Sequence, residues 1–283
     1  MKQITSAAEL RRELAAIRER GVTIGFVPTM GALHEGHLSL VRRSLVETSC
    51  TVVSIFVNPT QFGPNEDFSK YPRTLETDLD MLAEVGADFI FTPTVDDIYP
   101  AGASTGIDVG GLATIFEGEI RPGHYSGVCT VVASLFHIVE PDIAYFGQKD
   151  LQQVAVIKKM VRDLHIPVEI IVADTVREED GLAMSSRNRY LSAEQRAESL
   201  VLYRTLKAVE VAVAEGLSPN DAVLEGKRFF NEHATEATLD YLALVDPETF
   251  ATENSFKQAT KVSAIIAARI GTTRLIDNIP ITF

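Results

Sequence analysis

The sequence lacks the features that mark secreted, membrane and disulfide-bonded proteins. Only two of its 283 residues are cysteines, Cys50 and Cys129, and they fit neither a C-x-x-C pair nor a disulfide framework. No stretch reaches the roughly 18 uninterrupted apolar residues that a membrane span requires, and the charged N-terminal segment has no apolar signal region. We therefore expect a cytoplasmic protein with buried thiols and no membrane association.

Basic residues are also scarce. The chain has 26 lysines and arginines against 39 aspartates and glutamates, which gives a net charge of −13 at pH 7. Proteins that bind nucleic acids usually neutralise phosphates with a dense basic face, so this balance argues against DNA or tRNA as a partner. A local basic pocket that binds one nucleotide remains compatible with this charge balance.

The first part of the chain alternates apolar, β-branched runs with segments of helical periodicity. A helix is predicted from a capping box at Ser6 and Glu9 to Gly21. The predicted strands are 22–27, 51–57, 88–91, 142–146 and 168–172, and the helices between them are 38–48, 74–85, 128–139 and 151–164. Such alternation predicts a Rossmann-like, doubly wound parallel α/β sheet over residues 1–175.

The pattern changes in the second part of the chain. This change predicts a smaller α+β domain over residues 176–283. A long helix is expected from Ser192 and Gln195 to about Gly216, and another begins at Ser218-Pro219. Strand-like runs follow at 239–245, 261–268 and 273–276 without helix-length spacers after the first, as in a small antiparallel sheet.

Ligands of an open parallel sheet bind at the carboxyl ends of its strands. There the first strand is followed by PTMGALHEGH and a helix, so His34 and His37 lie at a helix N-terminus, where backbone N–H groups favour phosphates. An isolated H-x-x-H can instead cap a turn, and no nearby cysteine or third histidine completes a metal site.

Two carboxamides, Asn58 and Gln61, follow the second strand and suit the hydroxyl and carboxylate groups of a small polar substrate. The alternative is an ordinary Asn-Pro turn. After the fourth strand, Lys149 offers a point charge for a phosphate, and Asp150 either holds a ribose hydroxyl or caps the following helix.

The segment MSSRNR, at residues 184–189, carries two hydroxyls and a guanidinium, which suit a mobile lid over nucleotide phosphates; a polar linker is the alternative. The spacing of Gly118 and Gly123 imitates a P-loop, but His124 replaces the lysine, so we reject that motif. Asp96 and Asp97 could help to hold Mg²⁺ or be solvated loop charges.

The order of these segments is far more specific than any one of them. The chain contains PTMGALHEGH, FVNPTQF, YPRTLETD, RPGHYSGV, FGQKDLQQ and GLAMSSRNRYLS, and ends with RLIDN. In this order and spacing they resemble the motifs of the pantothenate synthetase family over nearly the whole chain. The departures are small, such as Gln148 where glutamate is common and Tyr125 where phenylalanine is common.

The resemblance implies the nucleotidyltransferase fold, with residues 34–37 in place of the HIGH signature and 184–187 in place of KMSKS. It implies condensation of pantoate with β-alanine in pantothenate and coenzyme A biosynthesis. Pantoate attacks the α-phosphate of ATP, pyrophosphate leaves, and β-alanine attacks the pantoyl-adenylate to release AMP. Mg²⁺ accompanies the ATP, residues 176–283 act as a lid domain, and the enzyme is a homodimer.

The same resemblance assigns roles to single residues. The catalytic residues are His37, as proton donor, His34 and Lys149, and no resident metal is expected. The substrate-binding residues are Gln61 and Gln153 for pantoate, with Asn58 as a further orienting group. The ATP-binding residues are Met30, Gly31, Ala32, Leu33, His34, Glu35, Gly36, His37, Gly147, Gln148, Lys149, Asp150, Val176, Met184, Ser185, Ser186 and Arg187.

Three other interpretations compete with the pantothenate synthetase interpretation. An adenylyltransferase of the same superfamily would keep AMP on its product, but Gln61, Gln153 and the second domain favour the synthetase. A tRNA-charging enzyme would need a basic anticodon-reading region, which the acidic C-terminal part does not offer. A nucleotide-binding sensor without catalysis would differ by releasing no pyrophosphate.

Overall fold

The computed structural model describes residues 1–64, 66–252 and 261–282. Two compact units make up the chain. The first unit comprises residues 1–147 and 156–173, and the second comprises 148–155 and 174–283. Residues 148–155, which come before the predicted boundary at 175, therefore group with the C-terminal part.

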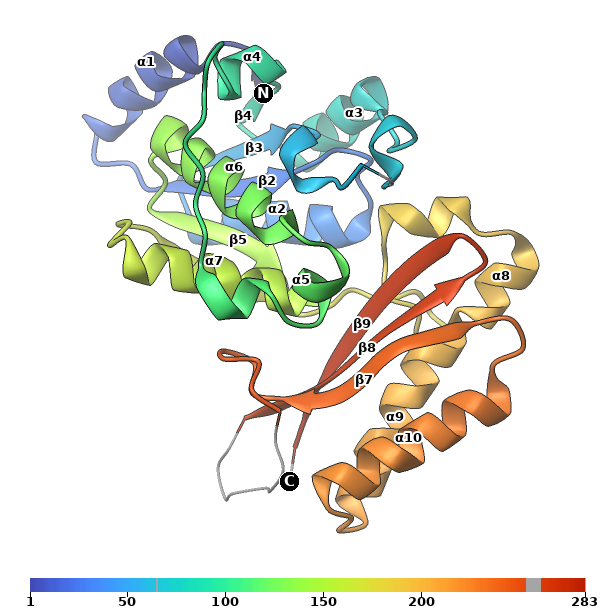
Figure 1. Cartoon of the computed structure of the whole chain (residues 1–283). Helices are drawn as coiled ribbons and strands as arrows, with labels where there is room; N and C mark the ends of the chain where they lie inside the picture. Colours follow the sequence, from blue (N-terminus) through green and yellow to red (C-terminus); the bar gives the residue numbers. More distant parts are fainter. Residues whose placement is uncertain (65, 253–260, 283) are drawn as a thin grey trace. The chain divides into compact units, whose positions relative to one another are not determined.

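The first unit is built on a six-stranded parallel sheet in the order β1-β4-β3-β2-β5-β6 (Figure 1). Its strands are β1 (Lys2–Ile4), β2 (Ile24–Thr29), β3 (Cys50–Ile55), β4 (Phe89–Phe91), β5 (Ile143–Gly147) and β6 (Glu169–Ala173). The order reverses between β2 and β5, which makes the edge beyond these strands a topological switch point where ligands of such sheets bind. The predicted Rossmann-like fold is confirmed.

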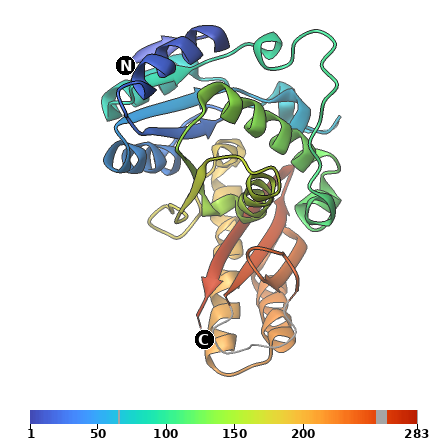
Figure 2. The same cartoon turned by 90° about the vertical axis from the view of Figure 1, so that its left-hand side faces the viewer.

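Helices cover both faces of this sheet, as right-handed crossovers require (Figures 1 and 2). The helices are α1 (Ala7–Arg18), α2 (Glu35–Glu47), α3 (Leu75–Val85), α6 (His124–Val139) and α7 (Leu151–Asp163), with short α4 (Val95–Ile98) and α5 (Glu117–Ile120). On one face, α2 and α3 contact each other and share a buried cluster with Val27, Val53 and Ile90. On the other, α1 contacts α6.

The periodicity located the longer elements of this unit to within a few residues. It missed β1, which is only three residues long, and the four-residue helices α4 and α5. The capping box predicted at Ser6 and Glu9 is wrong: Ser6 is the N-cap residue of α1, but its side chain makes no capping hydrogen bond. The helix also ends at Arg18, before Gly21.

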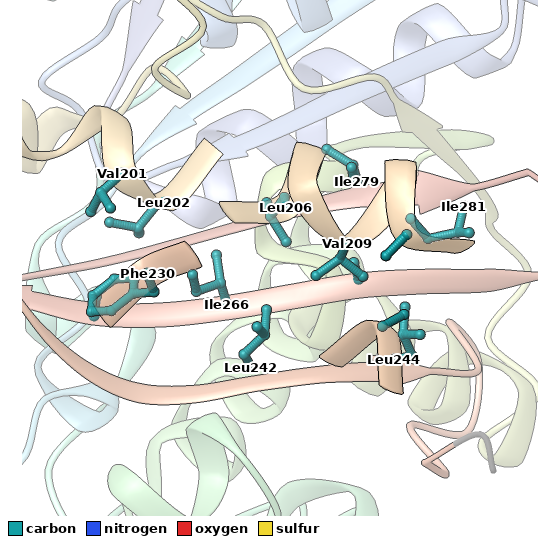
Figure 3. Packing of buried hydrophobic residues seen from close by; sticks show 14 of the residues in the cluster. Val201, Leu202, Leu206, Val209, Phe230, Leu242, Leu244, Ile266, Ile279 and Ile281 are labelled. Carbon is teal, nitrogen blue, oxygen red and sulfur yellow. The ribbon is translucent and has the colours of Figure 1, made fainter. Parts of the chain in front are cut away.

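The second unit contains an antiparallel sheet of β7 (Thr238–Val245), β8 (Val262–Ile270) and β9 (Thr273–Ile281), as predicted for an α+β domain. Its helices are α8 (Ala193–Glu198), α9 (Leu200–Ala214) and α10 (Pro219–His233). Apolar side chains of α9 and α10 pack on one face of the sheet, with Leu206, Val209 and Ile266 fully buried (Figure 3).

The sequence predicted one long helix where the structure has α8 and α9. Ser192 and Gln195 do form a capping box at the start of α8, and Ser218 caps α10 with Pro219 in its first turn. The helix is interrupted at Ser199, whose hydroxyl donates to the Arg196 carbonyl at 2.7 Å and competes with the helical ladder. Among the described residues, no helix has both the length and the apolar character of a membrane span.

Candidate active site

The loop between β2 and α2 is held by a buried carboxylate that sequence analysis did not select. Asp78, on α3, is 1% exposed. Its Oδ2 accepts a hydrogen bond from the Ala32 N–H at 2.9 Å, and its Oδ1 accepts one from the Leu33 N–H at 2.9 Å. The Thr74 hydroxyl also donates to Oδ1, at 3.2 Å. Two backbone donors of the predicted ATP-binding loop are therefore bound by the protein's own carboxylate.

These hydrogen bonds, which we call the Asp78 clamp, also explain the glycine in the loop. Gly31 has φ +76°, and a Cβ built at this position would lie 2.9 Å from Asp78 Oδ2. Ala32, which follows, adopts φ +50°, a left-handed conformation that costs a non-glycine residue about 1 kcal/mol. The two hydrogen bonds from Asp78 stabilise this conformation, so the chain enters α2 in one fixed direction.

That direction brings the two predicted histidines together. His34 is the N-cap residue of α2, and the His37 ring lies in its first turn. The ring centroids are 4.1 Å apart with the planes tilted by 38°. Helix N-termini carry positive partial charge and direct N–H groups outward, so both imidazoles lie where an anion is stabilised.

The turn after β3 fixes the orientation of Gln61, which is 7% exposed. Asn58 Oδ1 faces the Thr60 backbone N–H at 3.3 Å, and Asn58 Nδ2 faces the Gly127 carbonyl at 3.1 Å. Since a backbone N–H only donates and a carbonyl only accepts, the Asn58 amide has one orientation. Its Nδ2 also lies 3.1 Å from Gln61, so Gln61 presents Oε1 to Asn58 and Nε2 to Met30 Sδ at 3.0 Å.

Asn58 is therefore committed to the protein at both ends of its carboxamide. Besides these contacts, its Oδ1 accepts from the Tyr99 hydroxyl at 2.7 Å and from the Thr60 hydroxyl at 2.9 Å. Gly127 on α6 permits this close packing, because a Cβ there would lie 2.4 Å from the Thr60 carbonyl oxygen. These contacts hold Asn58 in the orientation that fixes Gln61.

A second polar group supports the backbone of Gln61. The His124 ring approaches the Gln61 carbonyl through Nδ1 at 2.8 Å, and Arg121 Nη1 lies 3.1 Å from His124 Nε2. Arg121 in turn makes a bidentate ion pair with Glu66, at 2.9 and 2.6 Å. Because Arg121 can only donate, His124 Nε2 accepts and Nδ1–H donates to the carbonyl.

His124 is thus held as a neutral imidazole. Burial, and after it the charge of Arg121, lower the pKa of His124 from 6.5 to about 4. In the sequence, this histidine argued against a P-loop and formed part of the RPGHYSGV motif. Its contact with Gln61 joins residues too far apart along the chain for any local pattern to indicate it.

The predicted phosphate-binding lysine belongs to the second unit. Gln148, Lys149 and Asp150 form a 3-10 turn at the start of α7, and Lys149 Nζ lies 3.5 Å from Asp150 Oδ1. The Lys149 side chain is 20% exposed, so its charge is partly shielded from water. Gln152 is buried and Gln153 is half-buried in the first turn of α7.

The segment at 176–190 is a hairpin followed by a 3-10 helix rather than an extended linker. The Met184 N–H donates to the Val176 carbonyl at 3.0 Å, which places these two predicted ATP-binding residues side by side. Ser185 caps the 3-10 helix of 186–190 by accepting from the Arg187 N–H at 3.3 Å, and Ser186 is buried. Arg196 binds Glu178 in the hairpin at 2.5 Å.

Within the described residues, no group of three or more His, Cys, Asp or Glu side chains is placed to hold a metal ion. Asp97 instead forms a capping box with Thr94 at the start of α4. The two cysteines are free and buried.

Together these features define an α/β protein with two adjacent histidines at a helix N-terminus and an oriented carboxamide, both beyond the carboxyl ends of parallel strands. A family model for pantoate-beta-alanine ligase matches residues 2–280. The chain belongs to the pantoate–β-alanine ligase family and is a ligase.

Individual relatives agree with this assignment. The pantothenate synthetase of Acidobacterium capsulatum is 50% identical, with 99% of this chain and 96% of the relative covered. The Thermus thermophilus pantothenate synthetase superimposes with a TM-score of 0.94 at 48% identity, covering 99% of both chains. The Francisella tularensis pantoate-beta-alanine ligase, solved in complex with beta-gamma ATP and beta-alanine, gives a TM-score of 0.79 at 36% identity over 99% and 97% of the chains.

Proposed function

We propose that this chain condenses pantoate with β-alanine at the expense of ATP, through a pantoyl-adenylate, and releases pyrophosphate and AMP. Membership of the family supports the overall reaction. The orientation of Gln61 is the observation that carries the substrate assignment: Asn58 fixes its Oε1, so Nε2 is the end that can donate to a carboxylate or hydroxyl of pantoate. Gln153 is the second proposed pantoate ligand.

In the first step, a carboxylate oxygen of pantoate attacks the α-phosphorus, and the bond from that phosphorus to pyrophosphate breaks. Negative charge grows on the α-phosphate and on the leaving group, so fixed positive groups there stabilise the transition state more than the bound substrates. We assign this role to His34, His37 and Lys149. His37 is the proposed proton donor to the leaving pyrophosphate.

In the second step, the uncharged amine of β-alanine attacks the acyl carbon. The carbon–oxygen bond to AMP breaks, and the nitrogen loses a proton as the amide forms. No covalent enzyme intermediate is required. The amine must be unprotonated to attack, so this step slows at low pH.

The remaining ATP contacts are proposed for the loop at 30–37, the turn at 147–150, the hairpin residues Val176 and Met184, and the segment 185–187. The first unit supplies the loop, whose backbone is already ordered by Asp78. We treat residues 1–175 as the nucleotide- and pantoate-binding domain and residues 176–283 as the lid domain.

We propose that Mg²⁺ arrives with ATP, bound mainly by the phosphates and water, as this ion commonly is in ATP-dependent enzymes. A homodimer in the cytoplasm completes the proposal. A reducing compartment suits the two buried free thiols, and sedimentation would establish the number of chains.

Isotope transfer tests the proposed intermediate. With ¹⁸O in the carboxylate of pantoate, attack on the α-phosphorus followed by amine attack on the acyl carbon leaves one labelled oxygen in AMP. Mass spectrometry of the nucleotide product should find this label. Release of ADP with labelled inorganic phosphate would instead indicate an acyl phosphate and contradict the proposal.

A further inference from the structure

Two consecutive buried residues of β9, Asp277 and Asn278, contact two segments that the proposed function places at ATP. They are 5% and 3% exposed. Polar side chains are rarely this buried unless their hydrogen bonds are made, and leaving one unmade costs about 1–3 kcal/mol. Their partners therefore show what the pair does.

Asn278 binds the turn that carries Lys149. Its Nδ2 donates to the backbone carbonyls of Gln148 and Lys149, both at 2.9 Å. A carboxamide nitrogen has two hydrogens, so both donors are used on neighbouring peptide groups. This fixes the peptide planes at the N-terminal end of α7 and, with them, the direction in which the Lys149 side chain leaves the backbone.

Asp277 binds the base of the hairpin at 176–184. Its two oxygens accept from Arg177 at 2.7 and 2.9 Å in a bidentate pair. Arg177 also donates to the carbonyls of Gly181 and Asn278 at 3.0 Å and lies over the Tyr203 ring of α9, 4.3 Å from its centroid. Four of the five guanidinium N–H groups are thus bound, which holds the hairpin to β9.

The alternation of side chains along a strand explains how adjacent residues reach different segments. Leu275, Ile279 and Ile281 belong to the cluster packed against α9, so Asp277 lies on the same face. Asn278 lies on the opposite face. One dipeptide therefore fastens both segments to a single strand of the second unit.

We infer that Asp277 and Asn278 are positioning residues, which fix the turn of Lys149 and the hairpin of Val176 and Met184 in the geometry that ATP requires. The inference rests on the proposed function. Misplacing a charged group by about 1 Å can cost roughly 10²-fold in rate. A role in folding alone would destabilise the protein without any preference between its substrates.

The variant Asn278→Asp separates the two roles. It keeps the shape of the side chain but replaces a nitrogen that donates with an oxygen that accepts, facing two carbonyls. We expect kcat/KM for ATP in pantoate-dependent pyrophosphate release to fall at least about 30-fold, while KM for pantoate rises by a smaller factor, because Gln61 lies outside the segments that Asn278 binds. Asp277→Asn should lower kcat/KM for ATP by less, since Arg177 keeps its two carbonyl partners.

A variant destabilised elsewhere in the same unit provides the control. Leu244→Ala removes a buried side chain from the α9 face of the same sheet, away from both segments. Equal losses of kcat/KM for ATP in Asn278→Asp and in this control would overturn the inference, as would an equal rise in both KM values. If Asn278→Asp does not fold, Asn278→Ala removes the same two donors without adding a charge.

Measurements on the wild type distinguish failure of this inference from failure of the proposed function. Absence of pantoate-dependent pyrophosphate release in the wild type would contradict the proposed function. Normal release in the wild type together with unchanged ATP kinetics in folded Asn278→Asp would contradict the positioning role alone.

Discussion

The loop after β2, in the first unit, and the turn at 148–150, in the second, are each held by one buried side chain from a distant part of the sequence. The two side chains have opposite hydrogen-bonding character. Asp78 accepts from the N–H groups of Ala32 and Leu33, whereas Asn278 donates to the carbonyls of Gln148 and Lys149. A loop entering a helix leaves N–H groups without helical partners, which favour a carboxylate. The 3-10 turn directs two carbonyls toward β9, and these require an amide.

The comparison teaches that near-isosteric residues are not interchangeable at such positions. Aspartate and asparagine have almost the same shape, yet each would present the wrong group at the other site. Reciprocal exchanges therefore test each clamp with little change in volume, and Asp78→Asn is the counterpart of Asn278→Asp.

The largest combined effect on stability and rate is expected for Asp78→Asn. The amide can accept from only one of the two N–H groups and sets its own N–H against the other, so a buried donor is left unpaired. We expect a loss of about 2–3 kcal/mol in the free energy of unfolding and a fall of at least about 100-fold in pantoate-dependent pyrophosphate release.

Urea unfolding and steady-state kinetics measure these two effects. Glu76→Gln is the matched control, because Glu76 lies on the exposed side of the same helix. If Asp78→Asn retained the stability and rate of this control, the loop would not depend on the clamp.

His37→Ala should have a large effect on rate and little on stability. Loss of a positioned proton donor typically lowers a rate by about 10²–10⁴-fold. The helix start is fixed by Asp78 and the backbone, so we expect the melting temperature to stay near that of the wild type. Single-turnover formation of the adenylate measures the rate, with His233→Ala, at an exposed histidine, as the control. A wild-type rate in His37→Ala would remove the mechanistic role of the histidine pair.

The smallest effect concerns the support of Gln61 and depends on pH. The pKa of His124 is about 4 in the folded protein against 6.5 as its ordinary value. Below pH 6.5 the unfolded chain binds a proton that the folded protein does not, so stability falls as pH drops from 6.5 toward 4. Between about pH 7.5 and about pH 5, this one group should remove about 2 kcal/mol of stability.

The glutamine side chain in His124→Gln does not titrate. This variant should therefore lose the part of the pH dependence of stability that His124 contributes. Urea unfolding at the two pH values measures the difference, with His233→Gln as a control that retains it. An unchanged pH dependence in His124→Gln would show that the buried imidazole is not the group responsible.

The fold could be predicted from the sequence because it depends on local periodicity. Apolar runs such as 51–57 and helical segments such as 74–85 required no knowledge of distant partners. The missed strand β1 has three residues, too few to show a period. The break at Ser199 escaped prediction because both flanking segments have helical character.

Much less of the site could be predicted. The sequence singled out His34, His37 and Gln61 because their types and positions suggest chemistry, and the structure brings the two histidines together and orients the glutamine. Asp78, His124 and Asn278 act on backbone groups of residues far along the chain, which no local pattern encodes. A weak signal existed, since Asp78 lies one turn before Leu82 on the buried side of α3, and Asp277 and Asn278 interrupt an apolar strand.

Ligase activity is tested most directly by measuring AMP and pyrophosphate formation from ATP and Mg²⁺, with pantoate and β-alanine supplied separately and together. Sustained release of AMP that requires both acids, with one pyrophosphate per AMP, is the expected result. No turnover with both acids present, or sustained AMP release without pantoate, would contradict the assignment.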